Sequence, residues 1–217
     1  MEALAAQAEQ VVSPQFEISE ERVDGWRAFR LVLDIARADR DAFVGLVRQS
    51  APQARIDEAP MLRGRVVGLK GASTDGMKVA PEAQWVLQGD RGLTYSEGVP
   101  DGSKVVKGTW WPADYTGEPL ISFEVDLARR LKVDVGDTVT VNVLGRNLIA
   151  RIASLREVKW ESLAINFVMV FSPNALKAAP HNLLATVTLL EPVGLATEAS
   201  VQRAVARTLP SVTMIRV

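Results

Sequence analysis

Apolar and polar residues alternate along residues 29–35, and this alternation predicts a strand near the start of the chain. The next segment carries a potential N-cap and apolar residues at helical spacing, namely Asp39, Phe43, Leu46 and Val47. Pro52 ends this predicted helix, because proline cannot continue one. A second strand is expected near residues 53–58, which completes a β-α-β unit.

The last part of the chain repeats this plan. Residues 183–190 are rich in β-forming side chains, and residues 212–217 again have the pattern of a strand. Between them, Thr197 can cap a helix that ends at Pro210. The apolar stripe of this helix comprises Val201, Ala204, Val205, Thr208 and Leu209. The β-α-β units at both ends predict an α+β fold with a ferredoxin-like, split β-α-β subdomain.

A long insert, residues 61–180, separates the two units and is predicted to be mostly β. It opens with a strand at residues 62–69. Ser122 is placed to cap a helix that runs through Leu131, with acidic residues in its first turn and arginines in its last. A short helix is expected to start at Ser172-Pro173, since proline is favoured at the first helical position.

The clearest β pattern of the insert is the alternation at residues 138–143. Its valines, Val139, Val141 and Val143, are expected to face a core, with Thr138, Thr140 and Asn142 turned away. Residues 145–147 form a plausible hairpin loop into a strand at 148–155. Residues 165–171 are almost continuously apolar, which favours a strand buried on both faces.

Composition narrows the function classes. The 217 residues are 47% hydrophobic and 24% charged, with a net charge of −1, so no basic footprint for nucleic acid is present. The absence of cysteine excludes disulfides, thiolate metal sites and thiol nucleophiles. Residues 1–25 are acidic and contain a possible short helix at 4–12. No apolar run reaches the ~20 residues that span a bilayer, and no signal peptide is apparent, so we expect a soluble chain that can be part of a longer protein.

No catalytic constellation is evident. The chain has no phosphate-binding glycine loop and no nucleophile elbow. His181 is the single histidine, at an expected loop-to-strand junction, and a structural role is favoured for it. The carboxylate pairs are interpreted as solvated charges or as a turn: Glu20 and Glu21, Asp134 and Asp137, and Glu157 and Glu161. We therefore expect no enzyme, with no catalytic, cofactor-binding or metal-binding residues.

Aromatic and basic residues leave two alternatives open. Trp110 and Trp111 are adjacent, so on a strand their side chains would point to opposite faces. One interpretation is that they pack in the core and under a covering loop. The other is that one of them is an exposed anchor for a partner or an acyl chain. A group of cations surrounds the predicted hairpin, and comprises Arg146, Arg151, Arg156 and Lys159. A solvated strand face is the favoured interpretation of this group, and contact with anionic headgroups is the alternative.

Several segments of the chain resemble a known family. They are residues 85–95 (WVLQGDRGLTY), 108–111 (GTWW), 131–141 (LKVDVGDTVTV), 155–160 (LREVKW) and 166–173 (NFVMVFSP). Together they resemble the periplasmic region of FtsX/MacB-like ABC transporter permeases, in particular the subfamily linked to a lysophospholipase. The resemblance extends over roughly residues 29–217 and identifies no substrate-contacting residue.

This resemblance implies a fold, a location and partners. It implies a porter-like α+β subdomain from residues 1–60 and 181–217, with a mostly β, Sabre-like subdomain inserted at 61–180. Such a domain lies on the periplasmic side of the bacterial inner membrane, between two membrane helices. Its partners would be a cytoplasmic ATP-binding subunit and an envelope protein or lipid substrate. The alternatives are a free-standing periplasmic ligand- or protein-binding module and a small hydrolase.

Overall fold

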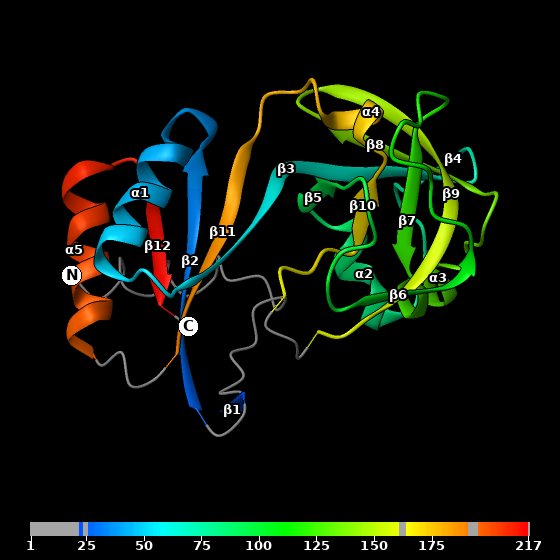
Figure 1. The fold of residues 1–217 in the computed structure, drawn as a ribbon. Helices are drawn as coiled ribbons and strands as arrows, with labels where there is room; N and C mark the ends of the chain where they lie inside the picture. The colour runs from blue at the N-terminus through cyan, green and yellow to red at the C-terminus, as the bar shows by residue number, and fades with distance from the viewer. Residues whose placement is uncertain (1–21, 24–25, 161–163, 191–194, 217) are drawn as a thin grey trace, which may run out of the picture.

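The computed structural model describes residues 22–23, 26–160, 164–190 and 195–216, and their elements form two lobes (Figure 1). The terminal lobe is built from both ends of the chain. Its elements are β1 (Arg22–Val23), β2 (Trp26–Ala36), α1 (Arg40–Ser50), the first half of β3 (Arg55–Leu69), β11 (Asn182–Leu190), α5 (Leu195–Thr208) and β12 (Thr213–Arg216).

The central lobe contains the second half of β3 and everything between β3 and β11. Its remaining strands are β4 (Ala72–Ser73), β5 (Arg91–Tyr95), β6 (Ser103–Gly108), β7 (Leu120–Glu124), β8 (Thr138–Val143), β9 (Arg146–Val158) and β10 (Met169–Phe171). Its helices are α2 (Pro81–Leu87), α3 (Val125–Leu131) and α4 (Pro173–Leu176). The fold is therefore mixed α+β, with many strands and few helices.

The terminal lobe is an open sheet with the strand order β12-β2-β11-β3, in which all neighbours are antiparallel. Helices α1 and α5 pack side by side against this sheet (Figure 1). Their buried side chains meet those of the strands in one apolar cluster that includes Phe43, Val47, Val201, Val205, Ile35, Ala185, Val187 and Leu189. The sequence predicted both helices and all four strands.

The helix starts differ from the predictions in detail. Asp39 occupies the N-cap position of α1 but makes no side-chain cap bond, and its backbone is already helical, with φ −92° and ψ −5°. Its carboxylate accepts a hydrogen bond from Ser211 at 3.3 Å. Thr197 lies inside α5, which already begins at Leu195, so its prediction as the N-cap was wrong. The possible helix at residues 4–12 lies outside the described residues.

In the central lobe, six strands pair back on themselves. β3 pairs with β5, β5 with β10, β10 with β7, β7 with β9, β9 with β8, and β8 returns to β3. These pairings form a closed ring, so neighbouring strands satisfy each other's backbone groups all the way round. β6 adds to the outside through β9, and β4 through β3.

The inside of this ring carries the predicted valines. Val139 and Val141 are fully buried and Val143 is 7% exposed, whereas Thr138, Thr140 and Asn142 alternate with them as half-buried residues. The predicted β8–β9 hairpin is present, but its turn is Leu144-Gly145. Arg146 and Asn147, which were predicted as loop, already pair with Val143 and Asn142 as the start of β9. The alternation therefore gave the correct register for this part of the sheet.

The helix predicted from Ser122 begins later than expected. Ser122 lies within β7, and the N-cap of α3 is Glu124, whose carboxylate accepts hydrogen bonds from the main-chain nitrogens of Asp126 (3.0 Å) and Leu127 (2.7 Å). The Ser122 hydroxyl instead accepts a hydrogen bond from Ser154 at 2.9 Å inside the core. A buried serine on a strand has the same sequence signature as a cap, which explains the error.

The strand predicted at residues 165–171 is shorter than expected, because only Met169–Phe171 pair as β10. All three of these residues are buried, as predicted. The preceding backbone is held by side chains: Arg156 donates to the Phe167 carbonyl oxygen, and Asn166 donates to that of Lys159 at 3.0 Å. The short helix after Ser172 is confirmed as α4.

The two lobes share strand β3. Its residues 55–61 pair with β11 of the terminal lobe, and residues 62–69 pair within the central ring. The two separate strands predicted at 53–58 and 62–69 are therefore one continuous strand, in which Pro60 is accommodated opposite Leu183 of β11. Among the described residues, no helix combines the length and apolarity needed to cross a bilayer.

Candidate functional site

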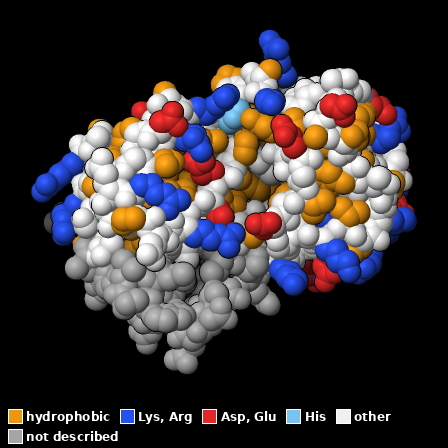
Figure 2. Space-filling view, viewed as in Figure 1, with side chains coloured by type: hydrophobic (Ala, Val, Ile, Leu, Met, Phe, Trp, Pro, Cys, Tyr) orange, Lys and Arg blue, Asp and Glu red, His pale blue; other side chains and the backbone are white. Residues whose placement is uncertain are grey.

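A cleft of about 210 Å³ opens between the lobes, at the place where β3 and β5 diverge. Leu62–Gly64 pair with β5, but beyond Leu93 strand β5 turns toward β10, and Thr94 and Tyr95 pair there with Val170 and Phe171. The cleft is lined by Arg55, Asp57, Glu58, Ala59, Pro60, Thr94, Tyr95, Ser96, Pro100, Asp101, Ala164, Ile165 and Phe167. Figure 2 shows hydrophobic side chains in the hollow between the lobes, with charged side chains beside it.

Carboxylates dominate the charged rim of this cleft. Arg55 pairs with Asp57 on its own strand at 2.9 Å and reaches across the cleft to Asp101 at 3.6 Å. Arg40 binds one oxygen of Glu58 at 2.7 Å, and this carboxylate raises the pKa of Arg40. The other oxygen, Oε1, is buried and has no hydrogen-bond partner among the described residues. The cleft therefore has negative charge that these ion pairs do not fully balance.

The single histidine lies near one end of the cleft, in the connection from α4 to β11. His181 Nδ1 is 2.7 Å from the Ala179 carbonyl oxygen, and Nε2 is 3.2 Å from the Tyr95 hydroxyl. A carbonyl oxygen only accepts, so Nδ1 carries the proton and Nε2 of the neutral ring accepts from Tyr95. Burial raises the pKa of Tyr95. These two bonds orient the ring and give it no serine or carboxylate partner of the kind a hydrolase needs.

The tryptophan pair departs from the prediction. Trp110 and Trp111 lie after the end of β6 and do not point to opposite faces, because their rings stack at 4.1 Å. Their indole nitrogens donate to the carbonyl oxygens of Glu97 and Ser96, each at 2.9 Å, beside the cleft. Trp111 is 4% exposed and packs with Phe167, Val170 and Leu184 in an apolar cluster between the lobes. The two tryptophans therefore pack in the apolar cluster between the two lobes.

Gly108 explains why the strand ends before the tryptophans. Its φ of +78° belongs to the left-handed region, and a Cβ atom there would lie 2.2 Å from the Ala153 carbonyl oxygen. Only glycine fits such a position without displacing β9. The prediction placed both tryptophans on a strand because it took no account of this backbone conformation.

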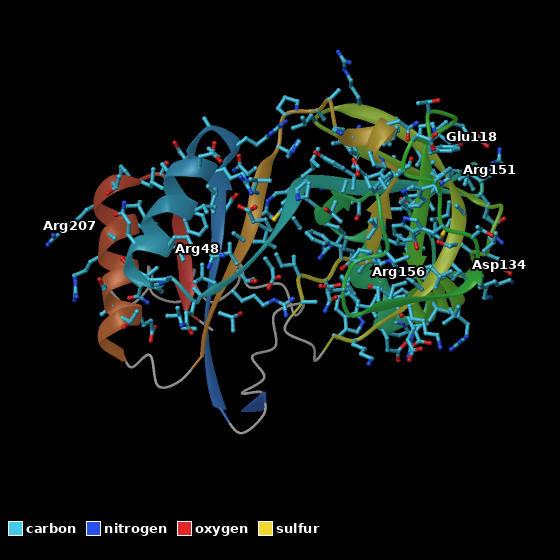
Figure 3. All side chains as sticks on the ribbon, viewed as in Figure 1. Arg48, Glu118, Asp134, Arg151, Arg156 and Arg207 are labelled. Carbon is cyan, nitrogen blue, oxygen red and sulfur yellow. The ribbon has the colours of Figure 1, made fainter. Side chains whose placement is uncertain are left out.

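Arg156 was predicted to belong to a solvated basic face, and this was wrong. Arg146, Arg151 and Lys159 are exposed, whereas Arg156 is 1% exposed. Its guanidinium donates to the Phe167 carbonyl oxygen and to the Ser103 hydroxyl at 3.2 Å. Burial lowers its pKa to about 10, and Glu124 opposes that shift, so it stays charged at neutral pH. Figure 3 shows it inside the central lobe, where it fixes the backbone of a cleft residue.

The predicted carboxylate pairs are not gathered into a site. Asp134 and Asp137 form the predicted turn, in which the Asp137 carboxylate accepts from the Asp134 main-chain nitrogen at 2.7 Å. Glu157 is exposed on β9, while Glu20, Glu21 and Glu161 lie outside the described residues. In the part of the chain that the structure describes, no group of three acidic or histidine side chains is arranged to hold a metal ion.

The cleft residues were missed at the sequence level. Asp57 and Glu58 are consecutive residues of β3, but Asp101 comes from a segment far away in the chain, and no spacing rule connects it to them. One signal was available: Pro60 falls inside a strand, and proline within a strand indicates a sheet edge. That signal would have identified this part of β3 as an edge.

Comparisons with known proteins give one relative at the sequence level. No protein-family model matches the chain. The chain is 36% identical over 128 residues to the uncharacterized ABC transporter permease YbbP of Escherichia coli strain K12. The match covers 58% of this chain and spans 15% of the length of that protein. Among solved structures, it resembles a domain described as part of a permease protein of Porphyromonas gingivalis, with a TM-score of 0.41, 13% identity and 87% coverage of each chain.

Proposed function

We propose that this chain is the extracytoplasmic domain of an ABC transporter permease of the FtsX/MacB-like, lysophospholipase-linked type. In this role it couples ATP hydrolysis by a separate cytoplasmic subunit to export or to mechanical work in the cell envelope. The observation that carries the proposal is the 36% identity to an ABC transporter permease over 128 residues. An envelope protein or a lipid would be the molecule that the domain acts on.

The strand order supports the domain division that belongs to this proposal. In a ferredoxin-like, split β-α-β unit the spatial order of the strands is 4-1-3-2 with antiparallel neighbours, and the order β12-β2-β11-β3 agrees with it. We therefore assign residues 1–60 and 181–217 to a porter-like subdomain and residues 61–180 to an inserted, Sabre-like subdomain.

The directions of the outer strands support attachment to two neighbouring membrane helices. β12 pairs with β2 from Thr213 opposite Asp34 to Arg216 opposite Leu31, the middle residue of β2, so β12 runs toward the end of the sheet at which β2 begins. The central lobe lies to the side of this sheet (Figure 1). The proposal also expects residues 4–12 to lie at this same end of the sheet, but these residues are outside the described part of the chain.

Thiol labelling of the full-length permease tests the location. The 217-residue chain has no cysteine, so a single introduced cysteine is the only thiol within these residues. Asp75→Cys places a thiol at an exposed position, and Ser154→Cys places the matched thiol at a fully buried one. In spheroplasts, a membrane-impermeant maleimide should label Asp75→Cys and should reach Ser154→Cys only after denaturation. Labelling of Asp75→Cys only after lysis of the inner membrane would contradict the proposal.

A crosslink across the cleft tests the coupling. Arg55 and Asp101 stand on opposite walls of the cleft and their side chains form an ion pair, so cysteines at these positions can be joined by a short bismaleimide. If the lobes move against each other during the ATP cycle, the crosslink should slow ATP turnover by the full-length transporter. The control joins Asp126→Cys to Arg129→Cys, an ion pair within one helix. Equal turnover in the two crosslinked variants would count against coupling through lobe movement.

The proposal assigns no catalysis to this chain. ATP, p-nitrophenyl esters and lysophospholipids are suitable substrates for the purified chain, because they probe the activities closest to the proposed transporter. We expect no turnover above the buffer rate. Turnover that survives repurification and is lost in a His181→Ala variant would revive the hydrolase alternative. Purification of the chain from the periplasm without any membrane-bound portion would favour a free-standing binding module.

A further inference from the structure

We propose that the cleft between the lobes binds an extended, cationic polypeptide segment, which adds as a strand along the edge of β3. The partner is thus a protein that presents an extended stretch with lysine or arginine side chains. This binding site goes beyond the proposed transport role and does not depend on it. It rests on an open strand edge, on charge and on the shape of the cleft.

The edge is the first half of β3. Residues 55–61 pair with β11 on one side only, and β5 takes up the other side from Leu62 onward. Among the described residues no strand pairs with this other side over 55–61, and no turn or loop backbone forms a hydrogen bond there. In an antiparallel strand every second residue directs its N–H and C=O groups away from its partner, so these groups face the cleft. Pro60 is the exception, because it has no N–H and can only accept a hydrogen bond. An added strand would pair with them, as in other complexes formed by strand addition.

The charge of the cleft selects the partner. Asp57, Glu58 and Asp101 line it, and Arg55 is the only cation among its lining residues. Arg55 is already paired with two of these carboxylates, and its side chain remains 62% exposed. The Glu58 side chain is 20% exposed, and its Oε1 atom has no hydrogen-bond partner among the described residues. Lysine or arginine side chains of a partner would complement the charge of these carboxylates.

Size and apolar surface favour a polypeptide over a small molecule. The volume of about 210 Å³ lies below the roughly 300 Å³ at which small-molecule pockets begin. Phe167, Ile165 and Pro100 supply an apolar wall opposite the edge, suited to the alternate side chains of a strand. The acidic N-terminal residues of this chain, with Glu17, Glu20 and Glu21, have the same charge as the cleft and are poor candidates for its occupant.

Three synthetic peptides and the 217-residue chain test the proposal. The first is acetyl-Val-Lys-Val-Lys-Val-Lys-amide, the second replaces each lysine by glutamate, and the third is the lysine peptide with alternate main-chain nitrogens methylated. Binding is measured by amide NMR shifts and by tryptophan fluorescence, since Trp111 donates a hydrogen bond to Ser96 of the cleft wall and Trp110 stacks on Trp111. We expect only the first peptide to bind, with the largest shifts at residues 55–60 and 94–101.

Two variants locate the binding. Asp57→Asn should lower the affinity for the lysine peptide by about five- to tenfold, because it removes one carboxylate from the rim of the cleft. Asp126→Asn is the matched control, since it also breaks an exposed ion pair but lies on α3, and it should leave affinity unchanged. Equal binding of the lysine and glutamate peptides, unchanged binding after N-methylation, or shifts centred outside the cleft would each overturn the proposal. Displacement of the lysine peptide by millimolar cadaverine would also overturn it, because a small amine would then be the ligand.

Discussion

The sheet of the terminal lobe is open, with β12 at one edge and β3 at the other, whereas the strands of the central lobe close into a ring. Both lobes bury polar side chains: Thr186, Thr188 and Glu198 in the terminal lobe, and Ser122, Ser154, Glu124 and Arg156 in the central lobe. In the central lobe, Ser154 and Arg156 form hydrogen bonds with residues from distant parts of the sequence. The open lobe is thus defined mainly by amphipathic patterning, and the closed lobe also needs specific hydrogen bonds and glycines. Four variants of the central lobe test these requirements, in order of decreasing effect.

A charge inside the ring should have the largest effect. Val141 is fully buried on β8, so Val141→Asp introduces an unpaired carboxylate into the core and should cost about 4 kcal/mol of unfolding free energy. Its neighbour Thr140 faces outward, and Thr140→Asp should cost less than about 1 kcal/mol. Urea denaturation of both variants provides the measurement. Equal losses would show that the alternation along β8 has been assigned to the wrong faces.

A methyl group at Gly108 should have the next largest effect. The Cβ atom in Gly108→Ala would collide with the Ala153 carbonyl oxygen, and we expect a loss of about 2–4 kcal/mol. Gly145 also has a positive φ, of +81°, but nothing lies within 4 Å of the position that a Cβ atom would take there. Gly145→Ala should therefore cost only the backbone strain, about 1 kcal/mol. If thermal unfolding shows the same loss of stability for Gly108→Ala and Gly145→Ala, the close approach of residue 108 to β9 does not contribute to stability.

The buried serine pair should give a smaller and non-additive effect. Ser154→Ala leaves the buried Ser122 hydroxyl without this partner and should cost about 1–2 kcal/mol. Replacing both serines by alanine also removes the hydroxyl that would be left without a hydrogen-bond partner. The double variant should therefore lose less unfolding free energy than the sum of the two single losses. Strict additivity in a double-mutant cycle would argue that the two hydroxyls do not interact.

The smallest effect is expected on the outer side of the ring. Arg151 binds Glu118 through two hydrogen bonds of 2.7 and 3.2 Å and lowers its pKa (Figure 3). Because the folded-state pKa lies below the unfolded value, this stabilisation is present above the ordinary pKa of about 4.5 and is lost as the pH falls through the folded-state value. Glu118→Gln should therefore flatten the acid side of the Tm–pH profile.

The control for this pH experiment is Glu157→Gln, which removes another exposed carboxylate, on β9. It should leave the shape of the profile unchanged. Since Glu118 and Arg151 are solvent-exposed, 1 M NaCl should reduce the difference between the wild type and Glu118→Gln. A salt-independent difference would point to packing by the glutamate stem instead of to the ion pair.

Sequence reasoning succeeded where the structure depends on periodicity. The strands at residues 29–35 and 183–190, the helix stripes of α1 and α5, and the inward valines of β8 all follow from the spacing of apolar residues. It failed at positions whose surroundings come from distant segments. Arg156 has the sequence context of a surface residue, but its partners are Phe167 and Ser103.

The candidate site was out of reach for the same reason. Its carboxylates become neighbours only because β3 and β5 diverge and because the turn at Asp101 folds back toward Arg55. Hydrophobic spacing says nothing about where two paired strands separate. Pro60 was the one local sign of an edge, and it gave no information on what lies opposite.

The continuity of β3 also has a mechanical consequence. The strand is 15 residues long, or about 50 Å at roughly 3.3 Å per residue, and its two halves are clamped by different neighbours. A pull along its axis would load the hydrogen bonds to β11 and to β8 in shear, so that many must break together. A sideways pull at the same points would open them one after another. The molecule should therefore be stiff along β3 and compliant across it, and optical-trap measurements with handles in the two orientations would reveal that anisotropy.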